Sequence, residues 1–264
     1  MEDRLKISYS AAELFRRCPA LWAERYIAKL VKSGDVPKRD FGARFHKLLE
    51  NFYAKSVQDT LDIPLTDIRL EAECQGMLEA YRAHYREEPF EVIDVEKWFE
   101  LPLPNSTHTL TGKIDMVVRD KATRELRVFE TKTQDRNSTS NTPDKVAVTD
   151  QIALYLWAAE RVYGESFGSV LYNVCVRQSE KGQVGPSFWR DNLERDAAQR
   201  EKAIADITWV ASNIEIAQAD FGEDTMAWPF NRSQCVFGRT RCDFYLVHLL
   251  GKSAETLRGF EVKT

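Results

Sequence analysis

The sequence predicts an α/β fold, and three observations predict it. Residues at helical spacing fill the first third of the chain, β-branched and aromatic runs separated by turn residues begin at residue 90, and a helix, a strand and a long helix follow. This order, ααα-βββ-α-β-α, carries no internal repeat and is that of one α/β domain. We expect a single domain over residues 1–264, with a helical front end (1–89), a core (90–220) and a cysteine-bearing tail (221–264).

The front end is expected to hold three helices. Ser10-Ala-Ala-Glu13 is a capping box, so a first helix is expected over roughly residues 10–32, with an interruption near Pro19. Apolar residues spaced three and four apart predict two further helices, at residues 41–54 and 67–87.

The core and the tail follow from the same kind of pattern. Three β-branched and aromatic runs, separated by Pro-Asn-Ser and Lys-Ala-Thr-Arg turns, predict antiparallel strands at residues 92–103, 108–120 and 125–133. An amphipathic helix over 150–164 is expected to end at Gly164. One more strand (169–176) and a long helix (191–220) should follow it, and the tail from Trp228 is expected to be loop-like.

Composition and charge narrow the classes of function. The chain is 43% hydrophobic and 30% charged, has no run of 18 apolar residues, and starts without the layout of a secretory signal, so we expect a cytoplasmic protein with no membrane contact. Its net charge of −4 gives no global attraction to polyanions. Residues 1–47 nevertheless carry 11 Lys and Arg against 6 Asp and Glu, whereas residues 51–100 carry 5 against 12. A basic front end permits a nucleic-acid face without proving one.

The chemistry concentrates in the three expected strands. Asp115 lies in a strand among apolar neighbours, where a carboxylate needs a partner, and Glu130 and Lys132 share one face of the next strand. Two carboxylates and an ammonium suit metal-assisted phosphodiester hydrolysis: the carboxylates hold Mg²⁺ or Mn²⁺, the metal activates water, and the lysine orients that water or stabilises the developing charge. On spacing alone, a strand-to-strand salt bridge of Lys132 is an equal alternative.

Five segments, in this order, resemble the PD-(D/E)XK nuclease superfamily, and more closely its branch of the RecB nuclease domain and the CRISPR-adaptation and phage exonucleases. They are residues 8–27 with their Cys-Pro pair, Gly42–His46, residues 112–118 (GKIDMVV), residues 128–133 (VFETKT) and Gln151–Tyr155. The resemblance implies a restriction-endonuclease-like core, in which a central mixed sheet is flanked by helices, together with a C-terminal metal-binding tail.

The same resemblance implies roles for particular residues. The catalytic residues would be Asp115, Glu130, Lys132, Gln151 and Tyr155, and the ligands of Mg²⁺ or Mn²⁺ would be His46, Asp115 and Glu130. Each role has a plainer alternative: His46 as a core histidine, Gln151 as a capped helix residue, and Tyr155 as a core aromatic. Glu96, on the first expected strand, is either a ligand of a second metal or a surface charge.

The cysteines form a second candidate site. Five cysteines in a chain without an export signal argue against a disulfide framework. Cys18 in the front end, with Cys235 and Cys242 in the tail, looks like the split four-cysteine iron-sulfur motif of this nuclease branch, and His248 stands where the fourth cysteine is expected. The resemblance implies a [4Fe-4S] cluster that joins the tail to the N-terminal segment. A Cys₃His Zn²⁺ site and an empty site are the alternatives.

These residues lead to a prediction of function. The side chains expected to contact DNA are Arg16, Arg17, Arg44, Lys47, Gln151 and Tyr155, and the alternative for the basic ones is a solvated surface. We expect a Mg²⁺- or Mn²⁺-dependent DNA nuclease, an exonuclease acting at DNA ends or in single strands. The alternative is a non-catalytic DNA-binding or assembly subunit of a recombination or CRISPR-adaptation complex. RNA as the substrate and a homo-oligomeric state both stay open.

Overall fold

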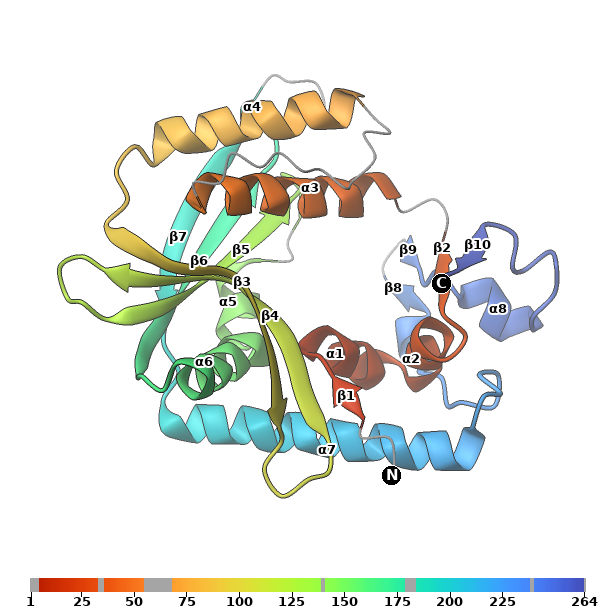
Figure 1. Cartoon of the computed structure of the whole chain (residues 1–264). Helices are drawn as coiled ribbons and strands as arrows, with labels where there is room; N and C mark the ends of the chain where they lie inside the picture. The colour runs from red at the N-terminus through yellow and green to blue at the C-terminus, as the bar shows by residue number, and fades with distance from the viewer. Residues whose placement is uncertain are drawn as a thin grey trace. The chain divides into compact units, whose positions relative to one another are not determined.

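The chain divides into two compact units, one of residues 37–99 and 112–203 and the other of residues 1–36, 100–111 and 204–264. The computed structural model in Figure 1 describes residues 5–32, 36–54, 68–138, 141–178, 184–237 and 240–263. Among these residues, no helix has the length and apolar character needed to cross a bilayer.

The unit of residues 37–99 and 112–203 is built on a mixed sheet. Its strands are β3 (Phe90–Pro102), β4 (Thr109–Asp120), β5 (Leu126–Gln134), β6 (Phe167–Val176) and β7 (Ser187–Leu193). β3 pairs with β4, β4 is antiparallel to β5, β5 is parallel to β6, and β6 is antiparallel to β7. Met116 lies opposite Phe129, so one further step along this register brings Asp115 opposite Glu130.

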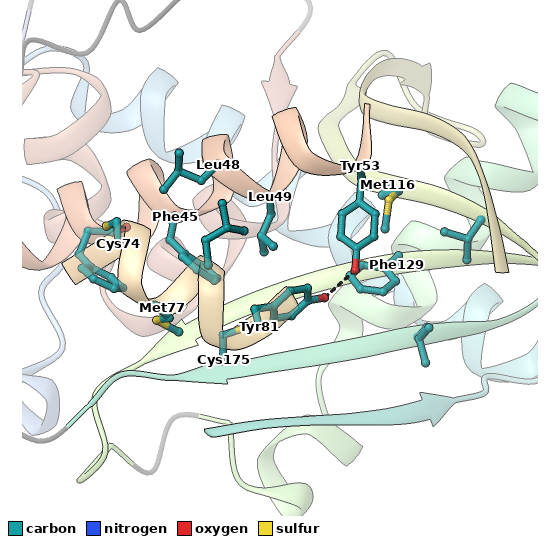
Figure 2. Packing of buried hydrophobic residues seen from close by; sticks show 14 of the residues in the cluster. Phe45, Leu48, Leu49, Tyr53, Cys74, Met77, Tyr81, Met116, Phe129 and Cys175 are labelled. Carbon is teal, nitrogen blue, oxygen red and sulfur yellow. Dashed lines mark hydrogen bonds between the residues drawn. The ribbon is translucent and has the colours of Figure 1, made fainter. Parts of the chain in front are cut away.

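Helices cover both faces of this sheet, with α3 (Val36–Tyr53) and α4 (Ile68–His84) on one face and α5 (Pro143–Ala147) and α6 (Asp150–Tyr163) on the other (Figure 1). Figure 2 shows the core under α3 and α4, where Tyr53 packs against Phe129 of β5, with ring centroids 5.8 Å apart, and Phe45 packs against Tyr81 of α4. Fully burying an aromatic side chain of this kind contributes about 1.5–3 kcal/mol, so this core holds α3 against the strands. The predicted α/β class, with a mixed sheet flanked by helices, is confirmed.

The other unit joins the two ends of the chain. From the N-terminal side it contains β1 (Lys6–Ile7), α1 (Tyr9–Arg17), α2 (Pro19–Tyr26) and β2 (Leu30–Lys32), and from the C-terminal side β8 (Val236–Phe237), β9 (Thr240–Arg241), α8 (Tyr245–Leu250), β10 (Phe260–Val262) and much of α7 (Ala197–Phe221). β2 and β10 pair antiparallel, and the Trp22 and Trp228 rings stack at 5.5 Å. These contacts hold the tail on the N-terminal segment.

The structure corrects three predicted helix starts and one helix end. The helix expected over 41–54 begins at Val36, and residues 30–32, the expected end of the first helix, form the strand β2. The first helix begins after Ser8, whose side chain accepts from the backbone N–H of Ala11, and not at the Ser10 capping box. Pro19, which lacks an N–H, then opens a separate helix, α2. The predicted helix over 191–220 begins at Ala197, because Asp196 and Gln199 exchange side-chain and backbone hydrogen bonds as a capping box.

Two further expectations were wrong. Residues 187–193 form the strand β7, which was not predicted, and the tail expected to be loop-like holds short strands and the helix α8. The strands of the tail, β8, β9 and β10, have only two or three residues each. Segments this short show no hydrophobic periodicity, because they are defined by the partner strand with which they pair. Asp67, the expected start of the third helix, lies outside the described residues.

Gly112 allows β3 to pack closely on β4. A Cβ at this position would lie 2.5 Å from Cζ and 2.8 Å from Cε1 of the buried Phe99 ring. We therefore expect Gly112→Ala to lower the free energy of unfolding by about 1–3 kcal/mol, measured by urea denaturation. The matched control is Gly76→Ala in α4, where no atom lies within 4 Å of the new Cβ and the alanine should be neutral or stabilising. Equal effects of the two substitutions would contradict the packing argument.

Candidate active site

Two carboxylates face each other where β4 and β5 pair. Oδ2 of Asp115 accepts a 2.9 Å hydrogen bond from the backbone N–H of Thr131, which fixes this carboxylate against β5. Glu130 is 2% exposed. Its Oε1 accepts from Nζ of Lys132, two residues along the same strand, whereas its Oε2 is buried and has no hydrogen-bond partner. A buried carboxylate oxygen without a donor is a strong acceptor left for a cation or a ligand.

His46 reaches these carboxylates from α3. Its Nδ1 lies 3.5 Å from Oδ2 of Asp115. One helical turn earlier, a Cβ at Gly42 would lie 3.1 Å from Oγ1 of Thr133, so the absence of a side chain lets α3 lie close to β5. Burial lowers the pKa of His46 to about 4, and the imidazole is therefore neutral near pH 7, as a metal ligand must be.

The first turn of α6 holds Glu130 in place. Thr149 caps this helix by accepting from the backbone N–H of Gln151. Nε2 of Gln151 donates to Oε1 of Glu130 at 3.1 Å and to the Tyr155 hydroxyl at 3.0 Å. Burial, with Glu130 nearby, raises the pKa of Tyr155, so its hydroxyl stays protonated. Gln151, one of the six residues expected to contact DNA, thus holds the Glu130 carboxylate, and Tyr155, another of the six, accepts from Gln151.

Burial and mutual electrostatic interaction shift the pKa values of the two carboxyl groups and of Lys132. Burial, reinforced by Asp115, raises the pKa of Glu130 to about 7, and burial also raises the pKa of Asp115. Burial alone would lower the pKa of Lys132, but Glu130 and Asp115 outweigh it and raise that pKa, so the ammonium stays charged. Two carboxylates that resist ionising together favour a bound proton or a bound cation.

Comparison of the sequence with known protein families agrees with this geometry. The sequence model of the PD-(D/E)XK nuclease superfamily matches residues 6–245. The chain belongs to this superfamily. Membership implies a phosphodiester hydrolase acting on nucleic acid. No curated protein matches the chain in sequence.

Two solved structures are similar to this superfamily member. The crystal structure of SSO0001 shares 12% identity and a TM-score of 0.38, over 82% of this chain and 78% of that one. A protein from Eubacterium rectale, described as a "Putative exonuclease", shares 12% identity and a TM-score of 0.52, over 91% of this chain and 92% of that one. The second likeness shows a shared fold.

The residues present fit the divalent cation that this superfamily usually uses. Two carboxylates, one of them with an unpartnered oxygen, supply the hard oxygen donors that Mg²⁺ and Mn²⁺ prefer, and the neutral imidazole of His46 adds one nitrogen donor. Within the described part of the chain, no three His, Cys, Asp or Glu side chains are already grouped as a metal centre. The side chains that would hold a cation here are those of His46, Asp115 and Glu130.

Metal binding by this site should depend on pH. Glu130 must lose its proton before it binds a cation, and its pKa of about 7 means that this proton leaves between about pH 6 and pH 8. We expect the apparent affinity for Mn²⁺ to rise up to about tenfold per pH unit below pH 7 and to level off above it. His46, with its pKa lowered to about 4, adds no step in this range.

Mn²⁺ titrations followed by electron paramagnetic resonance across this pH range measure the effect. Glu130→Gln should remove both the slope and most of the affinity, whereas Glu194→Gln, at an exposed position of the same unit, should change neither. An affinity that is independent of pH in the wild type would show that Glu130 is not the titrating ligand.

A small cavity of about 20 Å³ adjoins His46 and Asp115, and two further glutamates line it, Glu50 and Glu96. Glu50 lies one helical turn after His46 on α3. This spacing places both side chains on one face of the helix and could have identified Glu50 as a site residue, but the sequence interpretation did not include it. In the structure Glu50 pairs with Lys47 at 2.8 Å, and Glu96 pairs with Lys113. Both acidic side chains are thus paired with lysines at the edge of the site.

Among the basic residues predicted to contact DNA, Arg44 lies in a position that does not fit this role. It is 2% exposed, and its guanidinium forms a bidentate pair with Glu71 of α4. A buried, paired guanidinium cannot neutralise a phosphate, so its role is to tie α3 to α4. Arg16 pairs with Glu13 at 2.6 Å within α1, and the backbone carbonyl of Arg17 accepts from Nδ2 of Asn231.

The candidate cysteine centre lies in the other unit. Cys18 is buried and accepts a hydrogen bond at 3.4 Å from the backbone N–H of Asn231. Sγ of Cys235 donates to the carbonyl of the same Asn231 at 3.7 Å, and the backbone N–H of Cys242 donates to the carbonyl of Cys235 at 2.9 Å, so hydrogen bonds connect the three cysteine segments. Burial raises the pKa of Cys235 and of Cys242. His248 is placed differently: its Nε2 lies 3.9 Å from Oε1 of the buried Glu24. The described residues hold no preformed four-ligand centre here.

Proposed function

We propose that this superfamily member is a Mg²⁺- or Mn²⁺-dependent deoxyribonuclease, and specifically an exonuclease that hydrolyses DNA at ends or in single strands. The observation that carries the proposal is Glu130, a buried carboxylate with one oxygen held by Lys132 and Gln151 and the other unpartnered. Asp115 and His46 lie beside it. The Eubacterium rectale protein of the same fold, described as a "Putative exonuclease", is consistent with this activity.

The chain supplies positioned groups for hydrolysis. His46, Asp115 and Glu130 would hold the cation, which when bound activates water and polarises the phosphate. The Thr131 N–H and the Gln151 amide fix the two carboxylates, so that little reorganisation is needed during the reaction. Water attacks the phosphorus in line, the P–O3′ bond breaks, and the leaving 3′ oxygen takes up a proton, which gives a 5′-phosphate. Lys132, kept charged by its neighbours, stabilises the negative charge on the phosphoryl oxygens.

Cleavage assays test this proposal directly. End-labelled linear single- and double-stranded DNA and a closed circle are incubated with wild type and with Glu130→Gln in Mg²⁺, Mn²⁺ and EDTA. We expect metal-dependent loss of the linear substrates with wild type alone, and a circle that stays intact because an end is required. Absence of cleavage in every metal, with DNA still bound, would favour the non-catalytic DNA-binding or assembly subunit. Cleavage of the circle would remove the requirement for an end.

A metal bound by Cys18, Cys235 and Cys242 is a separate proposal, which is supported by the hydrogen bonds that connect Cys18 and Cys235 through Asn231 and Cys235 to Cys242. We favour an iron-sulfur cluster over zinc because the sequence resembles cluster-bearing nucleases. The fourth ligand position stays open, since Nε2 of His248 lies 3.9 Å from Oε1 of Glu24. Protein purified without oxygen should contain iron and acid-labile sulfide, and Cys242→Ser should lower both, together with the melting temperature. Bound zinc would replace the cluster assignment. Metal-free protein would leave the three cysteines as packing residues.

A further inference from the structure

Trp98 on β3 is 71% exposed, although it belongs to the same unit as the candidate active site. Successive residues of a strand point to opposite sides, and the adjacent Phe99 is 6% exposed. The strand therefore buries one aromatic ring and presents the next one to solvent. A single exposed apolar residue needs no explanation, so the argument depends on what surrounds this indole.

A positive charge at the edge of the active site adjoins the ring. Nζ of Lys113, on β4, lies 5.7 Å from the centroid of the Trp98 ring. The same ammonium pairs with Glu96, which lines the small cavity beside His46 and Asp115. Lys113 also acts electrostatically on His46 and on Asp115, and it lowers the pKa of each. An exposed aromatic face and a cation thus lie together next to the candidate catalytic groups.

The position of this pair relative to the active site is fixed by packing. The Phe99 ring lies against Gly112 and meets the Tyr155 ring edge-on at 6.3 Å. Tyr155 in turn accepts from Gln151, which donates to Glu130. A short chain of contacts therefore connects the strand segment that carries Trp98 to the carboxylate of Glu130.

The backbone of β3 is also unusual at this point. Glu96 has φ of +52°, a left-handed conformation that a residue with a side chain adopts infrequently. Such conformations are energetically unfavourable and concentrate at functional sites. Here the distorted residue is the one whose carboxylate holds Lys113 beside the indole.

We propose that Trp98 and Lys113 form a nucleotide platform for the substrate of this site: the indole stacks on an unpaired base and the ammonium neutralises an adjacent phosphate. Aromatic stacking of this kind tolerates any base sequence, because every base has a π face. A base pair inside a closed duplex cannot offer that face. The platform, which rests on the proposed nuclease function, therefore selects single strands or splayed DNA ends over intact duplex.

Binding measurements in the Glu130→Gln background test the platform without cleavage. Dissociation constants are measured in Mg²⁺ for a labelled single-stranded oligonucleotide and for a blunt duplex of the same length. Trp98→Ala should weaken single-strand binding roughly ten- to hundredfold, and Trp98→Phe should retain most of it. The duplex should be affected less. Trp209→Ala, which removes a tryptophan that is 63% exposed on α7, is the matched control and should bind like the parent.

Tryptophan fluorescence supplies an independent readout. Single-stranded DNA should quench part of the emission of the Glu130→Gln parent and of Trp209→Ala, and this part should be lost in Trp98→Ala and Trp98→Phe. The platform is overturned if Trp98→Ala, shown to be folded by circular dichroism, binds single strands within twofold of the parent. An equal loss for the duplex or for Trp209→Ala would overturn it as well. If wild type cleaves nothing while the Trp98 effect is present, the nuclease function fails and the platform stands.

Discussion

Replacing Lys132 by alanine is expected to lower the rate of DNA cleavage by about a hundred- to thousandfold, with folding and DNA binding nearly unchanged. The ammonium is held by Oε1 of Glu130, and the two carboxylates raise its pKa, so under the proposed function it would be a fixed positive charge where negative charge develops in the reaction. Its side chain is 29% exposed at a strand position and buries little apolar surface. Without it, Glu130 can stay protonated near neutral pH, which limits the cost to stability.

Single-turnover cleavage of end-labelled linear DNA measures this rate, and thermal denaturation followed by circular dichroism measures the fold. Lys145→Ala, at an exposed lysine of α5 in the same unit, is the matched control and should change neither. Unfolding of Lys132→Ala would favour the alternative in which Lys132 forms a structural salt bridge. Full activity of the folded variant would show that this lysine takes no part in the reaction.

The carboxylate and lysine arrangement was predictable from the sequence because local geometry determines it. A period of two places Glu130 and Lys132 on one face of a strand, and the antiparallel pairing of β4 with β5 brings Asp115 opposite Glu130. A helical spacing of four likewise places Gln151 next to Tyr155. The hydrogen bond from Gln151 to Glu130 was not predictable in the same way, because it depends on how α6 packs against β5.

Features that depend on distant partners escaped the sequence interpretation. β2 and β10 exist because the two ends of the chain pair with each other, and neither segment is long enough to signal a strand by itself. Arg44 was expected to contact DNA because its charge suggests a surface position, but Glu71 of a later helix buries and neutralises it. The start of α7 is a different case, since the Asp196–Gln199 capping box was present in the sequence and was overlooked.

Replacing Arg190 of β7 should cost the protein much of its stability. Its guanidinium makes a bidentate pair with Glu88 at 2.6 and 2.8 Å and donates to the hydroxyls of Tyr53 and Tyr81. The Arg190 and Glu88 side chains are 11% and 15% exposed. Arg190→Met would leave the Glu88 carboxylate largely desolvated without a cation, so we expect the free energy of unfolding to fall by about 3–5 kcal/mol.

A double-mutant cycle, measured by urea denaturation, separates this effect from simple loss of packing. Glu88→Gln alone should also destabilise the protein, because it leaves the Arg190 guanidinium partly buried without a carboxylate partner. The double variant should lose much less free energy of unfolding than the sum of the two single losses. Additive losses, or single losses below about 1 kcal/mol, would contradict the buried pair. The pair also affects the active site, because Tyr53 lies on α3 with His46 and lines the same small cavity. Arg190→Met should therefore weaken Mn²⁺ binding, although Arg190 is no ligand, and the double variant should recover part of that affinity.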